Sequence, residues 1–201
     1  MRLLLATTNA GKVRELSMAL RGRPVETVSL GAYPGLPPVE EDGATFLANA
    51  VKKAGQFGRA TGAVVLADDS GLVVDALHGA PGVHSARFAG PGAGDAANNA
   101  LLLERLRHVP ASLRRARFHA VLALALPDGR IFTVDGTCEG EILTAPRGEG
   151  GFGYDPLFYL PAYGKTMAEL PLETKNRISH RGRALARMVR VLDWLLSTAA
   201  V

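Results

Sequence analysis

The sequence has little of the chemistry that cross-links chains or binds transition metals. Cys138 is the only cysteine among 201 residues, so an internal disulfide and a cysteine-based zinc site are both excluded. No apolar stretch approaches the ~18 residues of a membrane span. The N-terminal residues also lack the basic region and the long apolar segment of a signal peptide. These absences predict a cytoplasmic globular protein without a membrane partner.

Charge of one sign is also scarce. The net charge is +4, and no run of like charges stands out. This small excess would suit an anionic small molecule, but it is too scattered to predict a nucleic-acid groove. A solvated basic surface would explain it equally well. The length of the chain predicts one domain over 1–201, or two closely joined lobes, with a substantial core.

Strand-like and helix-like patterns are mixed along the whole chain and predict an α/β fold with one antiparallel hairpin. The expected strands are 2–6 and 25–30, an apolar run that leads into Asp68 and Asp69 and continues as LVVDAL beyond Gly71, and a hairpin over 116–142 around Pro127-Asp128-Gly129. The expected helices are 12–21, about 44–60, 95–107 and about 181–197. The glycine-rich stretches 79–94 and 145–156 are expected to be loops.

The turn ATTNAGKVRE after the first strand has the composition of an anion site. Asn9 suits the N-cap of the following helix, and Gly11 would let a ligand approach the backbone closely. Lys12 and Arg14 stand at the positive end of the helix dipole, where a cation is disfavoured unless an anion is bound. The Walker pattern is absent. The turn therefore indicates phosphate binding, with a plain turn and a solvated lysine as the alternative.

Acidic residues gather at two further places. Asp68 and Asp69 follow an apolar run and are expected at the end of a strand, where adjacent carboxylates are costly unless a cation neutralises them. Mg²⁺ would serve there, because it prefers oxygen ligands. Glu40 and Glu41 precede a predicted helix, where acids are also favoured simply by the helix dipole.

A polar stripe runs along the predicted helix at 44–60. Thr45, Asn49 and Lys53 follow one another at four-residue spacing, which places them on one face. The pattern fits solvated surface and the wall of a cleft equally well.

The segment RGEGGFGYDP contains a formal GxGxxG at Gly148, Gly150 and Gly153. It leads into Tyr-Asp-Pro rather than into a long helix, so it does not predict dinucleotide binding. A loop that exposes Phe152 and Tyr154 could present an aromatic face to a base. A glycine-rich turn with buried aromatic residues is the alternative.

A second pair of cations stands near the start of the last predicted helix. Lys175 precedes the segment ISHRG, in which Ser179 is a plausible N-cap. His180 and Arg181 then occupy the positive end of the helix dipole, as Lys12 does at the first helix. Two such arrangements in one chain strengthen the prediction of a polyanion or an electron-rich ligand edge.

Together these segments resemble the inosine triphosphate pyrophosphatase family, which includes the bacterial dITP/XTP pyrophosphatases. The resemblance extends from residue 1 to about 196 and rests on several motifs in order. They are TxNxxKxxEL (7–16), EEDGATFxxNAxxKA (40–54), ADDSGLVVDALHGAPGVHSAR (67–87), RFH (117–119), GGFGYDPLF (150–158) and KNxISHRGxAL (175–185).

The resemblance implies a fold and a set of roles. The fold would be a two-lobed mixed β-sheet flanked by helices, with the active-site cleft between the lobes. The catalytic residues would be Asp69, as the general base, and Lys53, which would lie near the triphosphate and help to neutralise the leaving pyrophosphate. The Mg²⁺ site would use Asp68, Asp69 and one of Glu40 and Glu41. The implied substrate-binding residues are Thr7, Thr8, Asn9, Ala10, Gly11, Lys12, Ser70, Phe152, Gly153, Tyr154, Asp155, Lys175, His180 and Arg181.

The implied reaction converts dITP, ITP or XTP and water into the nucleoside monophosphate and pyrophosphate, which would cleanse the nucleotide pool before DNA or RNA synthesis. The resemblance also implies a homodimer, with no nucleic-acid partner. Donors from His180 and Arg181 could bond the 6-oxo group of the purine.

Two rival functions stay open. One is a pyrophosphatase for modified pyrimidine nucleotides, of the related septum-associated family. The other is a non-catalytic nucleotide- or RNA-binding protein, which paired acids at Asp68 and Asp69 disfavour because they repel phosphate unless a metal is bound.

Overall fold

The apolar start of the chain forms a strand, and the polar turn after it begins a helix, as the sequence predicts. In the computed structural model, which describes residues 1–198, β1 is Arg2–Leu5 and α1 is Ala10–Ala19. The side chain of Asn9 caps α1, since its Oδ1 accepts a hydrogen bond from the backbone N–H of Lys12 at 3.0 Å. The capping role predicted for Asn9 is confirmed.

The contacts within the chain divide it into two units. Unit 1 comprises Met1–Asp69, Ala120–Gly136 and Arg181–Val201, and unit 2 comprises Ser70–His119 and Thr137–His180. The seven strands form one mixed sheet in the order β2-β1-β3-β4-β5-β6-β7. After β1 they are β2 (Glu26–Ser29), β3 (Val64–Val74), β4 (Arg115–Ala125), β5 (Ile131–Ile142), β6 (Phe158–Leu160) and β7 (Lys165–Thr166).

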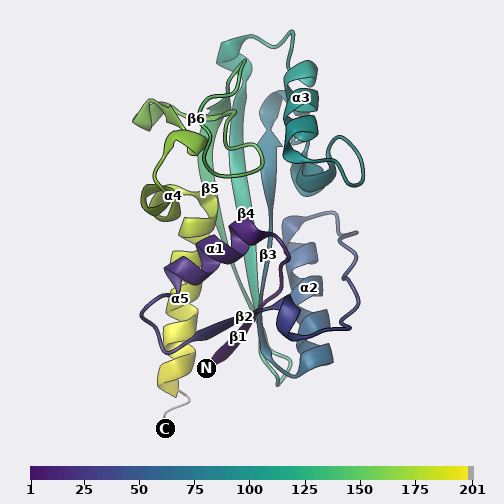
Figure 1. Cartoon of the computed structure of the whole chain (residues 1–201), viewed down its shortest axis with the longest axis vertical. Helices are drawn as coiled ribbons and strands as arrows, with labels where there is room; N and C mark the ends of the chain where they lie inside the picture. Colours follow the sequence, from purple (N-terminus) through teal and green to yellow (C-terminus); the bar gives the residue numbers. More distant parts are fainter. Residues whose placement is uncertain (199–201) are drawn as a thin grey trace. The chain divides into compact units, whose positions relative to one another are not determined.

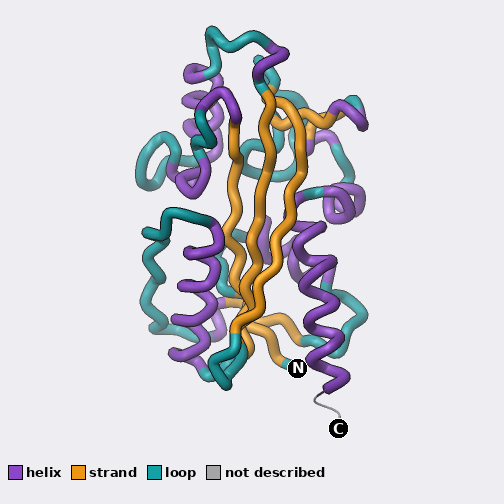
Figure 2. Tube along the Cα trace, turned by 180° about the vertical axis from the view of Figure 1, so that it is seen from behind, coloured by secondary structure: helices purple, strands orange, loops and turns teal. Residues whose placement is uncertain are grey.

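Two helix layers cover the strands of unit 1. α2 (Phe46–Thr61) lies on one side of the strands, and α5 (His180–Thr198) lies on the other (Figure 1; Figure 2). Leu3 and Leu5 belong to the cluster that packs with α1 and α5. The opposite sheet face receives α2, where a Cβ at Gly58 would stand 3.4 Å from that of Ala125. Successive side chains of a strand point to opposite faces of the sheet, so the same strands pack against the helices on both sides.

Unit 2 has its own apolar core. It contains α3 (Asp95–Arg105) and the short helix α4 (Leu172–Ile178). Its fully buried side chains include Leu72, Leu102, Leu106, Leu157 and Phe158.

The predicted hairpin is confirmed: Leu126 donates its N–H to the carbonyl of Arg130 across the turn between β4 and β5.

The expectation that Asp68 and Asp69 end a strand is wrong. β3 continues through Asp68 and Asp69 to Val74. A glycine makes this possible at position 71, where a Cβ would stand 2.3 Å from Oγ of Ser85 and 2.5 Å from the carbonyl oxygen of Gly82. The close approach of residues 82–87, a 3-10 helix inside the predicted loop 79–94, thus requires Gly71.

The remaining differences are short elements. The sequence does not predict α4, β6 or β7; β6 pairs with β5 across the intervening glycine-rich loop, and β7 pairs with β6. Among residues 1–198, none of the helices is long and apolar enough to cross a membrane. The single-domain organisation stays a prediction.

Candidate functional site

A buried ionic cluster forms around Asp68 in unit 1. Nζ of Lys12 pairs with Oδ1 of Asp68, and Nε of Arg181 donates to Oδ2 at 2.9 Å. Nη1 of Arg181 also donates to Oε2 of Glu15 at 2.5 Å. Asp68, Arg181 and Glu15 are all buried. We call these four residues, Lys12, Glu15, Asp68 and Arg181, the ionic quartet.

The electrostatics of the quartet keep Asp68 and Arg181 charged. Burial by itself would raise the pKa of Asp68, but the charges of Arg181 and Lys12 outweigh it and hold that pKa well below its usual range. Burial would likewise lower the pKa of Arg181, yet the carboxylates of Asp68 and Glu15 raise it. Two cations and two anions thus compensate one another inside the protein.

The quartet explains the cations at two helix starts. Lys12 lies in the first turn of α1, and Arg181 is the second residue of α5. The position of these two cations in the sequence predicts a bound anion beside them. The structure supplies a counter-ion of its own, because both side chains reach the same carboxylate, that of Asp68.

A buried amide holds the second aspartate. Nδ2 of Asn49 donates to Oδ2 of Asp69 at 3.0 Å, and Oδ1 of Asn49 accepts from the N–H of Gly43 at 2.7 Å. Asn49 and Lys53 are 1% and 7% exposed. The polar stripe on α2 therefore faces inward at these two residues, whereas Thr45 is exposed and caps the helix through the N–H of Ala48.

Asp69 is a carboxyl group whose pKa is raised in the folded protein. Burial raises its pKa to about 6, against the opposing charges of Lys53 and Lys12, while the nearby Glu41 raises it further. Lys53 also forms an ion pair with Glu41. A carboxyl group with a pKa of about 6 is largely ionised at neutral pH and can still accept a proton effectively, which is what a general base needs.

The acids that the sequence analysis assigned to a metal do not all gather. Glu41 acts on Asp69 electrostatically and pairs with Lys53, while Glu40 is exposed. In residues 1–198, no group of three or more His, Cys, Asp or Glu residues is arranged to hold a metal. Both carboxylate oxygens of Asp68 already bind cations. The ligand set Glu40, Glu41, Asp68 and Asp69 stays a prediction.

In unit 2 the glycine-rich loop is organised by Asp155. Its Oδ2 accepts from the N–H of Phe152 at 2.9 Å and from Nζ of Lys175 at 2.5 Å. The same ammonium lies 4.6 Å from the centroid of the Phe152 ring. Asp155 and Lys175 are both buried. Three residues predicted to bind the nucleoside are thus brought together.

One aromatic residue of this loop differs from the expectation. Tyr154 is buried in the core of unit 2, and its hydroxyl donates to the carbonyl of Ser85 at 2.8 Å. An exposed Tyr154 side chain, as one alternative proposed, is therefore wrong, because the ring completes the core. Burial, with a smaller contribution from Asp95, raises the pKa of its phenol. Phe152 is half-buried.

The other predicted residues are placed as follows. The ring of His180 stacks on Phe118 with centroids 4.7 Å apart. Ser70 is a half-buried residue of β3. Thr7 accepts a hydrogen bond from the N–H of Asn9 in the turn before α1. The ligand contacts of Thr7, Thr8, Asn9, Ala10, Gly11 and Lys12, and of the nucleoside-binding set, stay predictions.

Two residues in these clusters, Glu15 and Asn49, have contacts that the sequence does not predict. Glu15 appears only as a letter of the motif TxNxxKxxEL, and Asn49 only as a member of the polar stripe. The signal for Asn49 was its place between Thr45 and Lys53. The signal for Glu15 is its position directly before the core residue Leu16 in the predicted helix.

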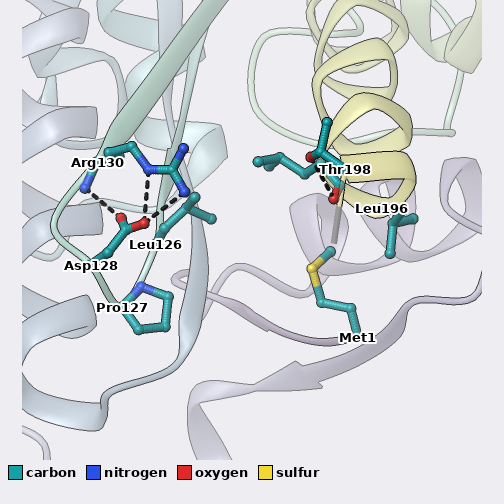
Figure 3. A pocket seen from close by; sticks show the side chains of 8 residues that line it. Met1, Leu126, Pro127, Asp128, Arg130, Leu196 and Thr198 are labelled. Atoms are coloured by element: carbon teal, nitrogen blue, oxygen red, sulfur yellow. Dashed lines mark hydrogen bonds and ion pairs between the residues drawn. The ribbon is translucent and has the colours of Figure 1, made fainter. Parts of the chain in front are cut away.

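A pocket of about 480 Å³ lies elsewhere in unit 1, at the β4–β5 turn (Figure 3). Its lining residues are Met1, Leu126, Pro127, Asp128, Arg130, Leu195, Leu196 and Thr198. None of the predicted site residues lines it. Its charged pair, Asp128 and Arg130, is bonded internally, so we do not assign the candidate site to this pocket.

The chain is thus a mixed α/β protein with a buried ionic quartet and a buried carboxyl group, that of Asp69, whose pKa is raised. Residues 3–191 match the model of the Ham1 family, and the chain belongs to that family. A dITP/XTP pyrophosphatase from Desulforamulus reducens is 57% identical over 97% of this chain and 97% of its own. One from Geobacter sulfurreducens is 55% identical over 96% of this chain and 97% of its own.

A solved structure supports the same relationship. The HAM1 protein of Coxiella burnetii is similar with a TM-score of 0.88 and 42% sequence identity, over 96% of this chain and 98% of that one. At this identity the likeness extends beyond the fold. The resemblance stated from the motifs is therefore confirmed.

Proposed function

We propose that this protein hydrolyses the non-standard purine nucleotides dITP, ITP and XTP to the nucleoside monophosphate and pyrophosphate. It is a dITP/XTP pyrophosphatase, a nucleoside-triphosphate pyrophosphatase of the Ham1 family. The observation that carries this function is the near-complete alignment with dITP/XTP pyrophosphatases at 55–57% identity. Asp69, with its pKa raised to about 6, provides the group that such a reaction requires.

Asp69 is proposed as the general base. Asn49 orients its carboxylate, and burial gives it the proton affinity to take a proton from the attacking water. The water oxygen then bonds to the α-phosphorus while the bond to the pyrophosphate oxygen breaks. Lys12, Lys53 and the N–H groups at the start of α1 would neutralise charge on the leaving pyrophosphate.

The same residues fit a magnesium ion. Asp69 and Glu41 offer oxygen ligands, and the charge of Glu41 acts on Asp69. Lys53 forms an ion pair with Glu41 and also acts on Asp69. When bound there, Mg²⁺ would lower the pKa of water and polarise phosphate oxygens. Because Glu40 is exposed and Asp68 is engaged by two cations, we propose Asp69 and Glu41 as its protein ligands.

The purine end of the substrate is proposed to lie against unit 2, near Phe152, Gly153, Tyr154, Asp155, Lys175 and His180. A half-buried aromatic ring and charged donors suit the face and edge of an oxopurine. The homodimer, the role of Arg181 in base recognition, the cytoplasmic location and the cleft between two lobes also stay predictions.

The proposed function predicts a clear product pattern. With Mg²⁺ present, ITP, dITP and XTP should give pyrophosphate rather than orthophosphate. ATP should be hydrolysed more slowly than these substrates by a factor on the order of 10² or greater. Chromatography of the products, with a modified UTP as a further substrate, measures this. Release of orthophosphate, or a preference for the modified UTP, would contradict the proposal.

The metal assignment predicts different effects for two neighbouring glutamates. Glu41→Gln should raise the Mg²⁺ concentration needed for half-maximal activity on the order of tenfold or more. Glu40→Gln is the matched control and should leave it unchanged, because that side chain is exposed. Titration of Mg²⁺ into chelator-treated protein measures both. An equal effect of the two changes would contradict the choice of Glu41.

A further inference from the structure

One glycine of the loop in unit 2 is held through both of its backbone polar groups. The N–H of Gly153 donates to Oδ2 of Asp95 at 2.6 Å, and its carbonyl accepts from Nδ2 of Asn99 at 2.9 Å. Asp95 and Asn99 stand four residues apart on α3 and therefore share one face of that helix. None of the motifs assigns a role to either residue.

Residues outside α3 hold the neighbouring part of the same loop. Gly153 has a φ of +63°, in the left-handed region that few other residues adopt. Just before it, Phe152 is fixed by the hydrogen bond from its N–H to Asp155 and by the ammonium of Lys175 over its ring. The N–H of Asp155 also donates to the carbonyl of Phe152 at 3.3 Å. The N–H and the carbonyl of Gly153 itself are bonded by the two residues of α3.

The orientation of the Asn99 amide favours a role in holding the loop over a role in the stability of unit 2. Its amide donates to Gly153, while its Oδ1 is buried and has no hydrogen-bond partner within residues 1–198. Leaving a buried acceptor unpaired costs stability. Asp95 is exposed, so its carboxylate adds little to the core. Both side chains thus serve the loop more than they serve the packing of unit 2.

We propose that Asp95 and Asn99 are positioning residues that set the conformation of Phe152–Asp155 for binding the purine. This inference rests on the proposed function, since it assumes that the loop meets the base. By fixing Gly153 they would hold the Phe152 ring where it can lie against the base. Without them the loop has several conformations, and the binding-competent one is less populated.

The test separates the two ends of the substrate. In Asn99→Ala and Asp95→Ala, the KM for ITP and the Kd for inosine monophosphate should rise on the order of tenfold, with kcat changed less. The Kd for inorganic pyrophosphate should stay at the wild-type value, because the triphosphate is assigned to unit 1. The ratio of kcat/KM for ITP over ATP should fall.

Two further variants act as controls, and a third replaces Asn99→Ala if that variant does not fold. Asp95→Asn keeps an acceptor oxygen for Gly153 without the charge, and should retain most of the wild-type affinity for inosine monophosphate. Glu104→Ala removes an exposed acid of α3 that pairs with Arg107, and should change nothing. If Asn99→Ala fails to fold, Asn99→Asp replaces it, since a carboxylate of similar shape cannot donate to the Gly153 carbonyl.

The outcomes are distinguishable. Wild-type affinity for inosine monophosphate in folded Asp95→Ala and Asn99 variants overturns the inference, even if they melt at a lower temperature. An equal loss in Asp95→Ala and Asp95→Asn would assign the effect to the helix dipole and also overturn it. If the wild-type protein does not release pyrophosphate from ITP, the proposed function itself fails.

Discussion

Asp69→Asn should abolish pyrophosphate release and at the same time stabilise the metal-free protein above pH 6. The amide cannot accept a proton from water, so the rate should fall on the order of 10²–10⁴-fold or more. Its oxygen can still accept the hydrogen bond from Asn49, so the local structure should persist. The ionised carboxylate is the form that burial penalises, and the substitution removes it.

The ionised Asp69 lowers the free energy of unfolding because its pKa is higher in the folded protein than in the unfolded chain. Asp69 titrates at about 6 in the folded protein and at about 3.9 when unfolded. As pH rises from about 4 to 6, the unfolded chain loses this proton first, so the free energy of unfolding falls. The loss is complete above pH 6 and amounts to about 2–3 kcal/mol as an upper estimate, since one pKa unit corresponds to about 1.4 kcal/mol.

Urea unfolding in chelator at pH 4.5 and pH 8 measures this effect. The gain from Asp69→Asn should be present at pH 8 and small at pH 4.5, where the wild-type carboxyl is protonated in the folded protein. Asp42→Asn is a control, because that acid is exposed and its pKa is lowered by a hydrogen bond from Lys52. Turnover of ITP at the normal rate by Asp69→Asn would show that another group is the base.

The second large effect concerns stability. Arg181→Ala should lower the free energy of unfolding by about 3–5 kcal/mol, because it leaves the carboxylates of Asp68 and Glu15 buried with one cation fewer. Arg187→Ala is a matched control on the same helix. Its ion pair with Asp135 is exposed, so the change should cost little.

A second substitution tests whether the stranded carboxylates cause the loss. Glu15→Gln in the Arg181→Ala background should recover part of the stability, because one uncompensated charge is removed. Denaturant unfolding of the two single variants and the double variant gives the coupling energy. Strictly additive losses would mean that Glu15 and Arg181 do not act through one another.

Local features of the fold could be predicted from the sequence. The cap at Asn9, the hairpin around Pro127-Asp128-Gly129 and the terminal helix each depend on residues within a few positions of one another. The continuation of β3 beyond Asp69 could not be predicted, because acids in the interior of a buried strand are tolerated only through partners such as Arg181, 113 residues away from Asp68.

The site was predictable as a set of residues more than as an arrangement. The motifs predicted which positions carry chemistry, since polar residues at helix starts and strand interiors need a reason. They did not predict that Asn49 bridges Asp69 and Gly43, or that Lys12 and Arg181 meet at one carboxylate. Side-chain pairing between distant segments leaves no periodic signal in one sequence.

The ionic quartet also limits how this protein can change by mutation. Any single charge-altering substitution at Lys12, Glu15, Asp68 or Arg181 would leave a net charge in a buried region, which is costly. Substitutions that remove one cation and one anion together would keep the balance. A library that randomises these positions one at a time should therefore yield few folded variants, whereas paired randomisation should reach sequences that single steps cannot.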